Sequence, residues 1–160
     1  MINQLLLAIL LTIAPISELR GGMPVAIDYA LKNNIPVLPI IALIILANIL
    51  VVFALFFFLD KFHETFMKFK LYNKFYSAYL KRIQKKIDKF EAKHETLGML
   101  ALTLFVAIPF PTTGVWSGTI LAWLLGLERK DSLKAIIVGV IIAGIIVSLA
   151  SLGVLGIFNP

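Results

Sequence analysis

The sequence of 160 residues has no cysteine and few charged side chains. Without cysteine, the chain forms no disulfide, binds no zinc through thiolates and uses no thiol nucleophile. Only 15% of its residues are charged and 60% are hydrophobic, whereas about 25% of the residues of a soluble domain are charged. A soluble domain of this length cannot hide so much apolar surface, so the composition predicts one all-α integral membrane domain over residues 1–160.

Residues typical of catalytic sites are also scarce. The two histidines, His63 and His94, belong to no pattern that indicates a metal triad or a Ser–His pair. The nucleotide-binding pattern G-x-x-x-x-G-K-[ST] does not occur, so the chain is not expected to hydrolyse ATP itself. We therefore expect no enzyme activity, no catalytic residue, no metal and no cofactor.

Two apolar runs are long enough to cross a bilayer. Residues 36–59 and 135–158 each contain 24 residues, and a spanning helix needs about 20. Asn48 is the only polar residue of the first run and lies near its middle, where it either joins helices or contacts a ligand. In the second run, the small-residue pairs Gly139/Ala143 and Gly144/Ser148 predict close helix packing.

Two other apolar regions, residues 2–31 and 97–127, are interrupted by segments rich in proline and glycine. Their first arms, 2–14 and 97–108, would be helices of roughly 18–20 Å, too short for a hydrocarbon core of about 30 Å. We predict two re-entrant helical hairpins, which need protein or a water-filled cavity around their tips. A kinked spanning helix in each region is the alternative. A signal peptide is disfavoured, because no basic residue precedes the first apolar stretch.

The two halves have the same layout. Residues 1–59 form repeat one and residues 97–160 form repeat two, each a hairpin followed by a spanning run, and an offset of 94 places Pro15 on Pro109. If each half crosses the membrane once, the halves are inverted repeats joined by residues 60–96. Inverted repeats with broken helices and a site at their interface are a recurring transporter design.

The positive charge is concentrated in the connecting segment. Ten of the fifteen Lys and Arg residues lie between Lys61 and Lys93, opposite a stripe of aromatic and aliphatic residues. This pattern predicts an amphipathic helix on the inner leaflet, either as a contact for anionic lipid or as a plain connector, and not a nucleic-acid site. By the positive-inside rule, residues 60–96 and 128–134 are cytoplasmic and both termini lie outside.

The first interruption, P-I-S-E-L-R-G-G-M-P, holds the main candidate site, Glu18 and Arg20. Charges at membrane depth usually pair, line an interior or serve a transport pathway. Either the two form an internal ion pair at the tip, or Glu18 carries a proton while Arg20 contacts an anion. Pro15, Gly21, Gly22 and Pro24 shape this tip, and the two glycines let backbone amides approach a ligand. Further on, Asp28 and Lys32 have the spacing of a helical ion pair.

The second interruption, P-F-P-T-T-G-V-W-S-G, carries no charge. Its polar side chains either satisfy freed carbonyls or form a neutral wall of the same site, and we select Thr112, Thr113 and Trp116. The residues expected to shape this tip are Pro109, Pro111, Gly114 and Gly118.

These two motifs resemble the signatures of the putative small multidrug export protein family, over nearly the whole chain. Glu18, Arg20 and Pro24 match the first motif, and Pro109, Gly114, Trp116 and Gly118 match the second. The layout is also similar to that of DedA-type membrane proteins, some of which are implicated in moving lipids or lipid carriers. The resemblance implies a transporter, with a homodimer or larger assembly expected for so small a chain. Three functions remain open: ion- or proton-coupled export of an amphipathic or lipid-like substrate, flipping of a lipid phosphate, and a non-transporting membrane scaffold.

Overall fold

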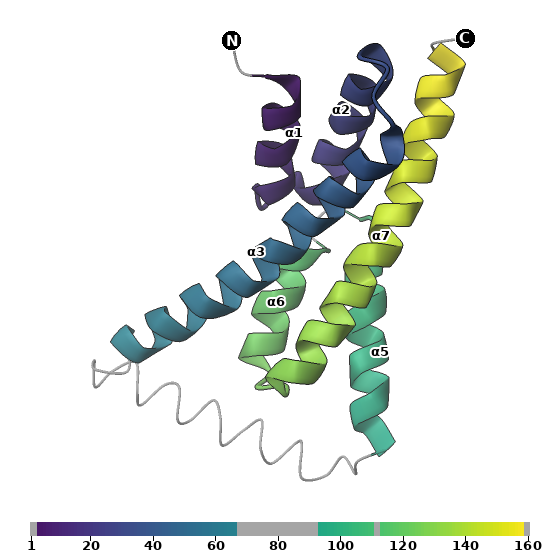
Figure 1. Ribbon diagram of the computed structural model, residues 1–160. Helices are drawn as coiled ribbons and strands as arrows, with labels where there is room; N and C mark the ends of the chain where they lie inside the picture. The colour runs from purple at the N-terminus through teal and green to yellow at the C-terminus, as the bar shows by residue number, and fades with distance from the viewer. Residues whose placement is uncertain (1–2, 67–92, 111–112, 159–160) are drawn as a thin grey trace.

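The computed structural model describes residues 3–66, 93–110 and 113–158, and this part of the chain forms six helices (Figure 1). The all-helical prediction is confirmed for these residues. The helices are α1 (Gln4–Ile13), α2 (Glu18–Lys32), α3 (Val37–Phe66), α5 (Lys93–Ala107), α6 (Val115–Leu124) and α7 (Arg129–Phe158). Most of the predicted amphipathic connector lies outside the described residues, although its first residues continue α3 and its last residues begin α5.

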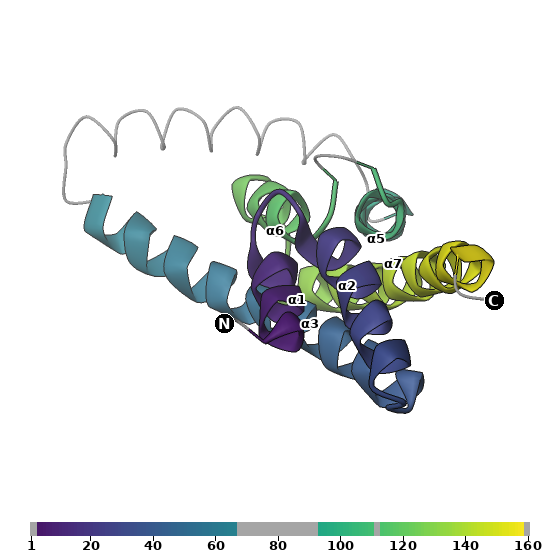
Figure 2. The ribbon, with the colours of Figure 1, turned by 90° about the horizontal axis from the view of Figure 1, so that it is seen from above.

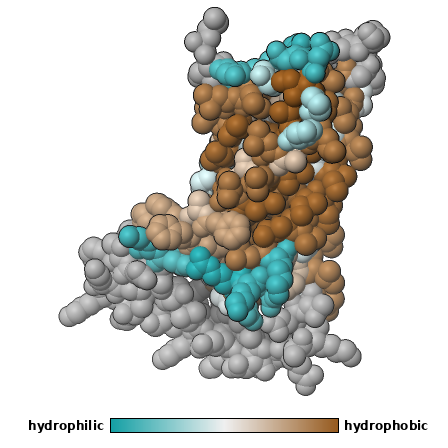
Figure 3. Space-filling model, in the orientation of Figure 1, coloured by the Kyte–Doolittle hydropathy of each residue, from teal (hydrophilic) through white to brown (hydrophobic). Residues whose placement is uncertain are grey.

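The two long helices, α3 and α7, contain the predicted spanning runs. Each has 30 residues, which corresponds to about 45 Å of helix. The stretches Val37–Phe62 and Arg129–Leu155 are long and apolar enough to cross a membrane. The surface carries a broad hydrophobic band between hydrophilic residues at the top and toward the bottom of the molecule (Figure 3). Both observations agree with the membrane class that the composition predicts.

The four short helices form two pairs that approach from opposite ends of the molecule. In Figure 1, α1 and α2 extend downward from the top, α5 and α6 extend upward from the bottom, and the turns within the pairs meet near the middle. From above, α1 and α2 overlie the middle of the helix bundle (Figure 2). Each pair also contacts the long helix of the other half, since α2 packs on α7 and α6 packs on α3.

The bounds of α1 follow from local sequence. The Asn3 side chain accepts a hydrogen bond from the Leu5 amide (3.2 Å) and so caps the start of the helix. Ala14 precedes Pro15, which disfavours the helical conformation, and Ala14 is extended with ψ of 138°. The helix therefore ends at Ile13.

The helix α2 begins earlier than the sequence predicts. We expected the break to reach the glycine pair, but only residues 14–17 lie outside the helices, and α2 contains Gly21, Gly22 and Pro24. A Cβ atom on Gly22 would lie 1.8 Å from Thr12 Oγ1 and 2.5 Å from the Ala8 carbonyl oxygen, both on α1. The close packing of α1 on α2 at this glycine supports a helix that local propensity alone does not favour.

Small residues on α7 allow two other close contacts. A Cβ atom on Gly139 would lie 2.8 Å from the Thr103 carbonyl oxygen of α5, and one on Gly144 would lie 2.6 Å from the Ile45 side chain of α3. The predicted close packing at these small-residue positions is confirmed. The fully buried core between the helices is mainly apolar and includes Met23, Ile27, Ile44, Val52, Val106 and Ile136.

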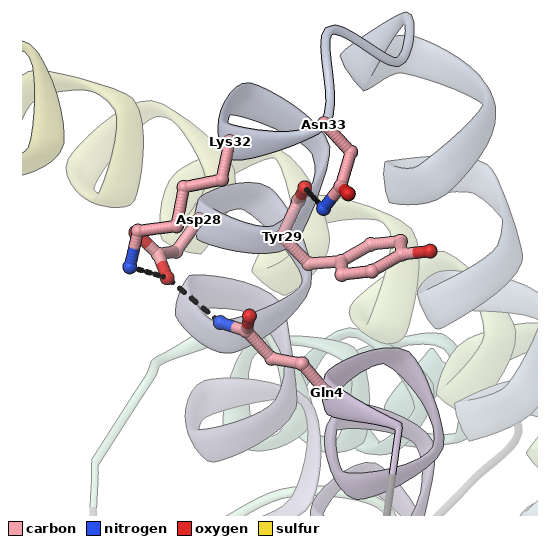
Figure 4. A network of polar contacts seen from close by, with 5 residues as sticks. All are labelled: Gln4, Asp28, Tyr29, Lys32 and Asn33. Atoms are coloured by element: carbon pink, nitrogen blue, oxygen red, sulfur yellow. Dashed lines mark hydrogen bonds and ion pairs between the residues drawn. The ribbon is translucent and has the colours of Figure 1, made fainter.

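A polar cluster joins the start of α1 to the end of α2 (Figure 4). Gln4 Nε2 donates to Asp28 Oδ2 over 2.7 Å, and Lys32 Nζ lies 2.8 Å from the same oxygen. The predicted Asp28–Lys32 ion pair is confirmed. These contacts lower the pKa of the Asp28 carboxyl, with the hydrogen bond from Lys32 as the largest cause and that from Gln4 as the second.

Asp28→Asn is expected to lower the free energy of unfolding near neutral pH by at most about 1 kcal/mol, the upper range for an exposed pair. Because the pKa of Asp28 is lower in the folded state, its stabilisation exists above the unfolded pKa of about 3.9 and is lost as the pH falls through the folded pKa. Thermal unfolding in detergent measures the difference, with the exposed Glu128→Gln as control. A difference that persists unchanged in acid would contradict this explanation.

A second polar cluster lies at the other end of the molecule. Asp60 of α3 accepts a hydrogen bond from Trp123 Nε1 of α6 (3.2 Å) and forms an ion pair with Arg129 of α7. The Arg129 guanidinium also lies 5.2 Å from the centre of the Phe56 ring. These contacts join α3 at Asp60 to the end of α6 and to the start of α7.

Candidate functional site

Glu18 connects the two helix pairs where their turns meet. Its side chain comes from the first residue of α2, is only 6% exposed, and reaches the start of α6. Oε2 accepts from the Val115 amide (3.3 Å) and Oε1 from the Trp116 amide (3.1 Å). The first amides of a helix have no partner within it and form the positive end of the helix dipole. The Glu18 carboxylate therefore caps a helix that begins 97 residues further along the chain.

The backbone on both sides of this contact is unusual. Glu18 has a φ of 47°, a left-handed conformation that costs about 1–2 kcal/mol for a residue other than glycine. Opposite it, Gly114 has a φ of 144° and lies so close that a Cβ atom would be 1.8 Å from Glu18 Oε2. Strained conformations of this kind cluster at functional sites, and here they bring a carboxylate against two backbone amides.

Arg20 contacts the same interruption of the second half, but at carbonyl groups. Its guanidinium donates to the carbonyl oxygens of Phe110 and Thr113, to that of Ile108 (3.5 Å), and to Thr113 Oγ1 (3.1 Å). These carbonyls follow the end of α5, where the helix dipole is negative. We use the name tip clasp for the contacts that Glu18 and Arg20 make with Ile108, Phe110, Thr113, Val115 and Trp116, which lie in or directly before the second interruption.

The tip clasp has matched charges on both sides. The carboxylate faces the positive start of α6, and the guanidinium faces the carbonyls beyond α5. Among the described residues, no ion pair joins Glu18 to Arg20, because each makes its hydrogen bonds to the other helix pair. Their charges still attract each other across the tip, although the described part of the structure does not contain the direct ion pair that we considered from the sequence.

Two polar residues selected from the second motif take part in the tip clasp. Thr113 Oγ1 accepts from Arg20 and lies 2.7 Å from the Ile108 carbonyl oxygen, to which it donates. Trp116 Nε1 donates to the Ile13 carbonyl oxygen at the end of α1 (3.0 Å). Thr112 and Pro111 lie outside the described residues. Of the predicted tip residues, Gly118 allows close packing, since a Cβ there would be 2.6 Å from Val106.

A model of the family described as "Putative small multi-drug export protein" matches residues 18–146. The chain belongs to this family. The match begins at Glu18 and includes every residue of the tip clasp. No curated protein and no solved structure matches the chain. The family description is that of an exporter and not of an enzyme, and together with two helices of spanning length it identifies a membrane protein.

In this export-family chain, a small cavity adjoins the tip clasp. Its volume is about 10 Å³, at the lower limit of what one water molecule needs. Glu18, Arg20 and Asn48 supply its polar side chains, and α5, α6 and α7 complete its wall. Asn48 is 1% exposed, and within the described part of the chain its Oδ1 has no hydrogen-bond partner. Asn48, which the sequence offered either as a helix-joining residue or as a ligand contact, thus lies beside the two charged residues.

Sequence reasoning missed the main-chain groups of the site. The amides of Val115 and Trp116 and the carbonyls of Ile108 and Phe110 belong to apolar residues, so no side-chain pattern marks them. The proline-rich interruption was the available signal, because it leaves helix ends whose amides and carbonyls need partners. Within the described residues, no three His, Cys, Asp or Glu side chains are close enough to hold a metal ion.

Proposed function

We propose that this chain is a small multi-pass transporter of the cell membrane that exports an amphipathic or lipid-like substrate and is coupled to protons or another ion. The family description supports export. The tip clasp supports coupling, because it brings a buried carboxylate, a guanidinium and a water-sized cavity together between two helix pairs. In this proposal, the helix pair α1 and α2 and the helix pair α5 and α6 act as gates on either side of the substrate site.

The proposed membrane arrangement is two inverted repeats with re-entrant hairpins, 2–31 and 97–127. The Gln4–Asp28 contact at one end and the Asp60–Arg129 pair at the other support it, because each joins segments that this topology places on one side. With residues 60–96 and 128–134 in the cytoplasm and both termini outside, Lys61, Arg129 and Lys130 face the inner leaflet. Anionic lipid contacts the segment 60–96, and two copies of the chain associate.

The carboxylate of Glu18 is the observation that carries this proposal. While charged, it stabilises the start of α6 through two amides and the helix dipole. Proton uptake removes the charge and weakens this half of the tip clasp, so the two helix pairs can separate. A proton then shifts the equilibrium between a closed and an open tip because it binds the two states with different affinity.

A transport assay with the purified protein in liposomes tests the proposal. A fluorescent cationic drug and a labelled polyprenyl phosphate are offered with and without a pH gradient, to wild type and to Glu18→Gln. We expect gradient-dependent movement of one probe by wild type, and movement no greater than in protein-free liposomes with Glu18→Gln. Glu128→Gln is the matched control, since its carboxylate is exposed between α6 and α7, and it should transport like wild type.

Thermal unfolding of each variant separates a transport defect from a folding defect. If Glu18→Gln unfolds at a much lower temperature, Glu18→Asp keeps the charge and provides the second comparison. Absence of movement of both probes with well-folded wild type would reject the transporter and favour a membrane scaffold, in which the tip clasp only joins the two helix pairs. Equal transport by wild type and a well-folded Glu18→Gln would reject coupling at Glu18.

A further inference from the structure

A second groove, separate from the small cavity, is also lined by Arg20. Arg20 and Pro24 of α2, Pro109 of the second interruption and one face of α7 between residues 146 and 155 line it. Its volume is about 380 Å³, within the range of about 300–1,000 Å³ typical of small-molecule sites. The groove thus has the size of a binding site and runs along a helix of spanning length.

The lining of this groove is apolar apart from two side chains. Ser151 donates its hydroxyl to the Val147 carbonyl oxygen over 2.7 Å, so its hydrogen is already used within α7. Among the described residues that line the groove, Arg20 is the only charged one. A long apolar surface with one cation at its edge is complementary to an amphipathic molecule whose charge is negative.

The charge of Arg20 is partly offset by the nearby Glu18 carboxylate, but the two groups form no direct ion pair. Among the described residues, the hydrogen bonds of Arg20 go to uncharged oxygens, namely three main-chain carbonyls and the Thr113 hydroxyl. In the part of the chain that the structure describes, no carboxylate forms an ion pair with it. A guanidinium has five N–H donors in a planar fork that matches carboxylate and phosphate oxygens, so an anionic group provides stronger partners than the carbonyls.

We propose that this groove binds an amphipathic anion, with its aliphatic tail along α7 and its anionic head on Arg20. The inference rests on the proposed function, since it names the class of substrate. A cationic amphiphile fits the apolar wall equally well, but its charge is repelled by Arg20. The groove therefore selects against positively charged amphiphiles.

Binding of the head group also affects the tip clasp. An anion on Arg20 competes with the carbonyls of Phe110 and Thr113 for the same N–H donors. Arg20 lines the small cavity together with Glu18 as well as the groove. Occupancy of the groove thus loosens the contact between the helix pairs next to the carboxylate, which links substrate binding to proton binding.

Equilibrium binding to the full chain in nanodiscs of phosphatidylcholine tests the inference. The probes share one tail: dodecyl phosphate, dodecanoate and dodecyltrimethylammonium, each corrected for binding to empty nanodiscs. We expect at least one anion to bind about tenfold or more tightly than the cation, and Arg20→Gln to remove this preference, as expected for a charge-assisted hydrogen bond. The two anions distinguish a phosphate head from a carboxylate head.

Two further variants locate the tail. Ala150 is exposed and lines the groove, so a phenylalanine at this position fills the groove. Ala150→Phe should weaken anion binding about tenfold, because the aliphatic tail can then bury less apolar surface. Ala54→Phe adds the same ring at an exposed position of α3 that is not part of the groove lining, and should bind like wild type. Equal affinity for anions and cation, or binding unaffected by Ala150→Phe, overturns the inference.

The binding test and the transport test can give different answers, so the groove and the transporter can be rejected independently. Anion binding that depends on Arg20 and Ala150, without movement of any probe in liposomes, supports the groove and rejects the transporter. Gradient-dependent transport by a protein that binds no amphipathic anion retains the proposed function and rejects the groove as its substrate site. If Arg20→Gln does not fold, binding to Ala150→Phe and the comparison of the three probes on wild type still test whether the groove binds an amphipathic anion.

Discussion

Replacing Gly114 with alanine is expected to lower the free energy of unfolding by about 3 kcal/mol or more, the sum of backbone strain and lost charged hydrogen bonds. The new Cβ would lie 1.8 Å from Glu18 Oε2 and 2.7 Å from Glu18 Cδ, so the carboxylate must leave the amides of α6. The φ of 144° adds strain even where space is made. Thermal unfolding in detergent measures the loss, and transport should fall with it.

Gly98→Ala is the matched control for this variant, because a Cβ at Gly98 meets nothing within 4 Å. Alanine within the helix α5 should be neutral or stabilise by about 0.5–1 kcal/mol. The double variant Glu18→Ala/Gly114→Ala removes the clash between the new Cβ and the Glu18 carboxylate but keeps the backbone strain at residue 114. Its loss of unfolding free energy should therefore be smaller than the sum of the losses of the two single variants. Gly114→Ala with the stability of Gly98→Ala would show that the tip clasp does not have the described geometry.

Gly22→Ala is expected to destabilise the protein by about 3 kcal/mol, at the upper end of the usual cost of overpacking. The added Cβ would lie 1.8 Å from Thr12 Oγ1 and 2.5 Å from the Ala8 carbonyl oxygen. The hydroxyl can turn away, but the carbonyl belongs to the backbone of α1, so the two helices must separate. Their separation displaces the turn that presents Glu18, and we expect loss of transport together with loss of stability.

Gly153→Ala provides the comparison, since a Cβ at this position of α7 lies in open space. Adding Thr12→Ala to Gly22→Ala removes the nearer of the two contacts, and stability should recover only in part because the Ala8 carbonyl remains. Complete recovery would mean that the hydroxyl alone limits the distance between α1 and α2. Unchanged stability of Gly22→Ala would contradict the close packing of these helices.

These two glycines show that the site depends on close approach of backbones as much as on charge. Gly22 allows α1 to contact α2 beside the turn that holds Glu18, and Gly114 leaves room for the Glu18 carboxylate at α6. A larger residue at either position alters the tip clasp without touching a charged group. Glycine is therefore required here for steric reasons, in addition to its backbone freedom at Gly114.

Several elements could be predicted from sequence because their causes are local. The apolar runs of 24 residues fix α3 and α7, Pro15 ends α1 through the conformation of Ala14, and Asp28 pairs with Lys32 at helical spacing. The helices α2 and α6 begin at Glu18 and Val115, within the interruptions that the sequence predicted to extend to Pro24 and Gly118. Local propensity reads glycine and proline as a break, whereas packing on α1 and the cap from Glu18 continue the helices through these residues.

The sequence by itself determined the membrane class, two helices of spanning length and two shorter apolar regions that are interrupted by proline and glycine. It also selected six polar residues to consider: Glu18, Arg20, Asn48, Thr112, Thr113 and Trp116. Only the tertiary structure decided what these residues contact. The carboxylate binds amides 97 and 98 residues away, and the guanidinium binds carbonyls between 88 and 93 residues away. Composition and periodicity report on one helix at a time, and main-chain amides and carbonyls are common to all residue types. Partners of this kind are defined only when the fold brings one helix end to another.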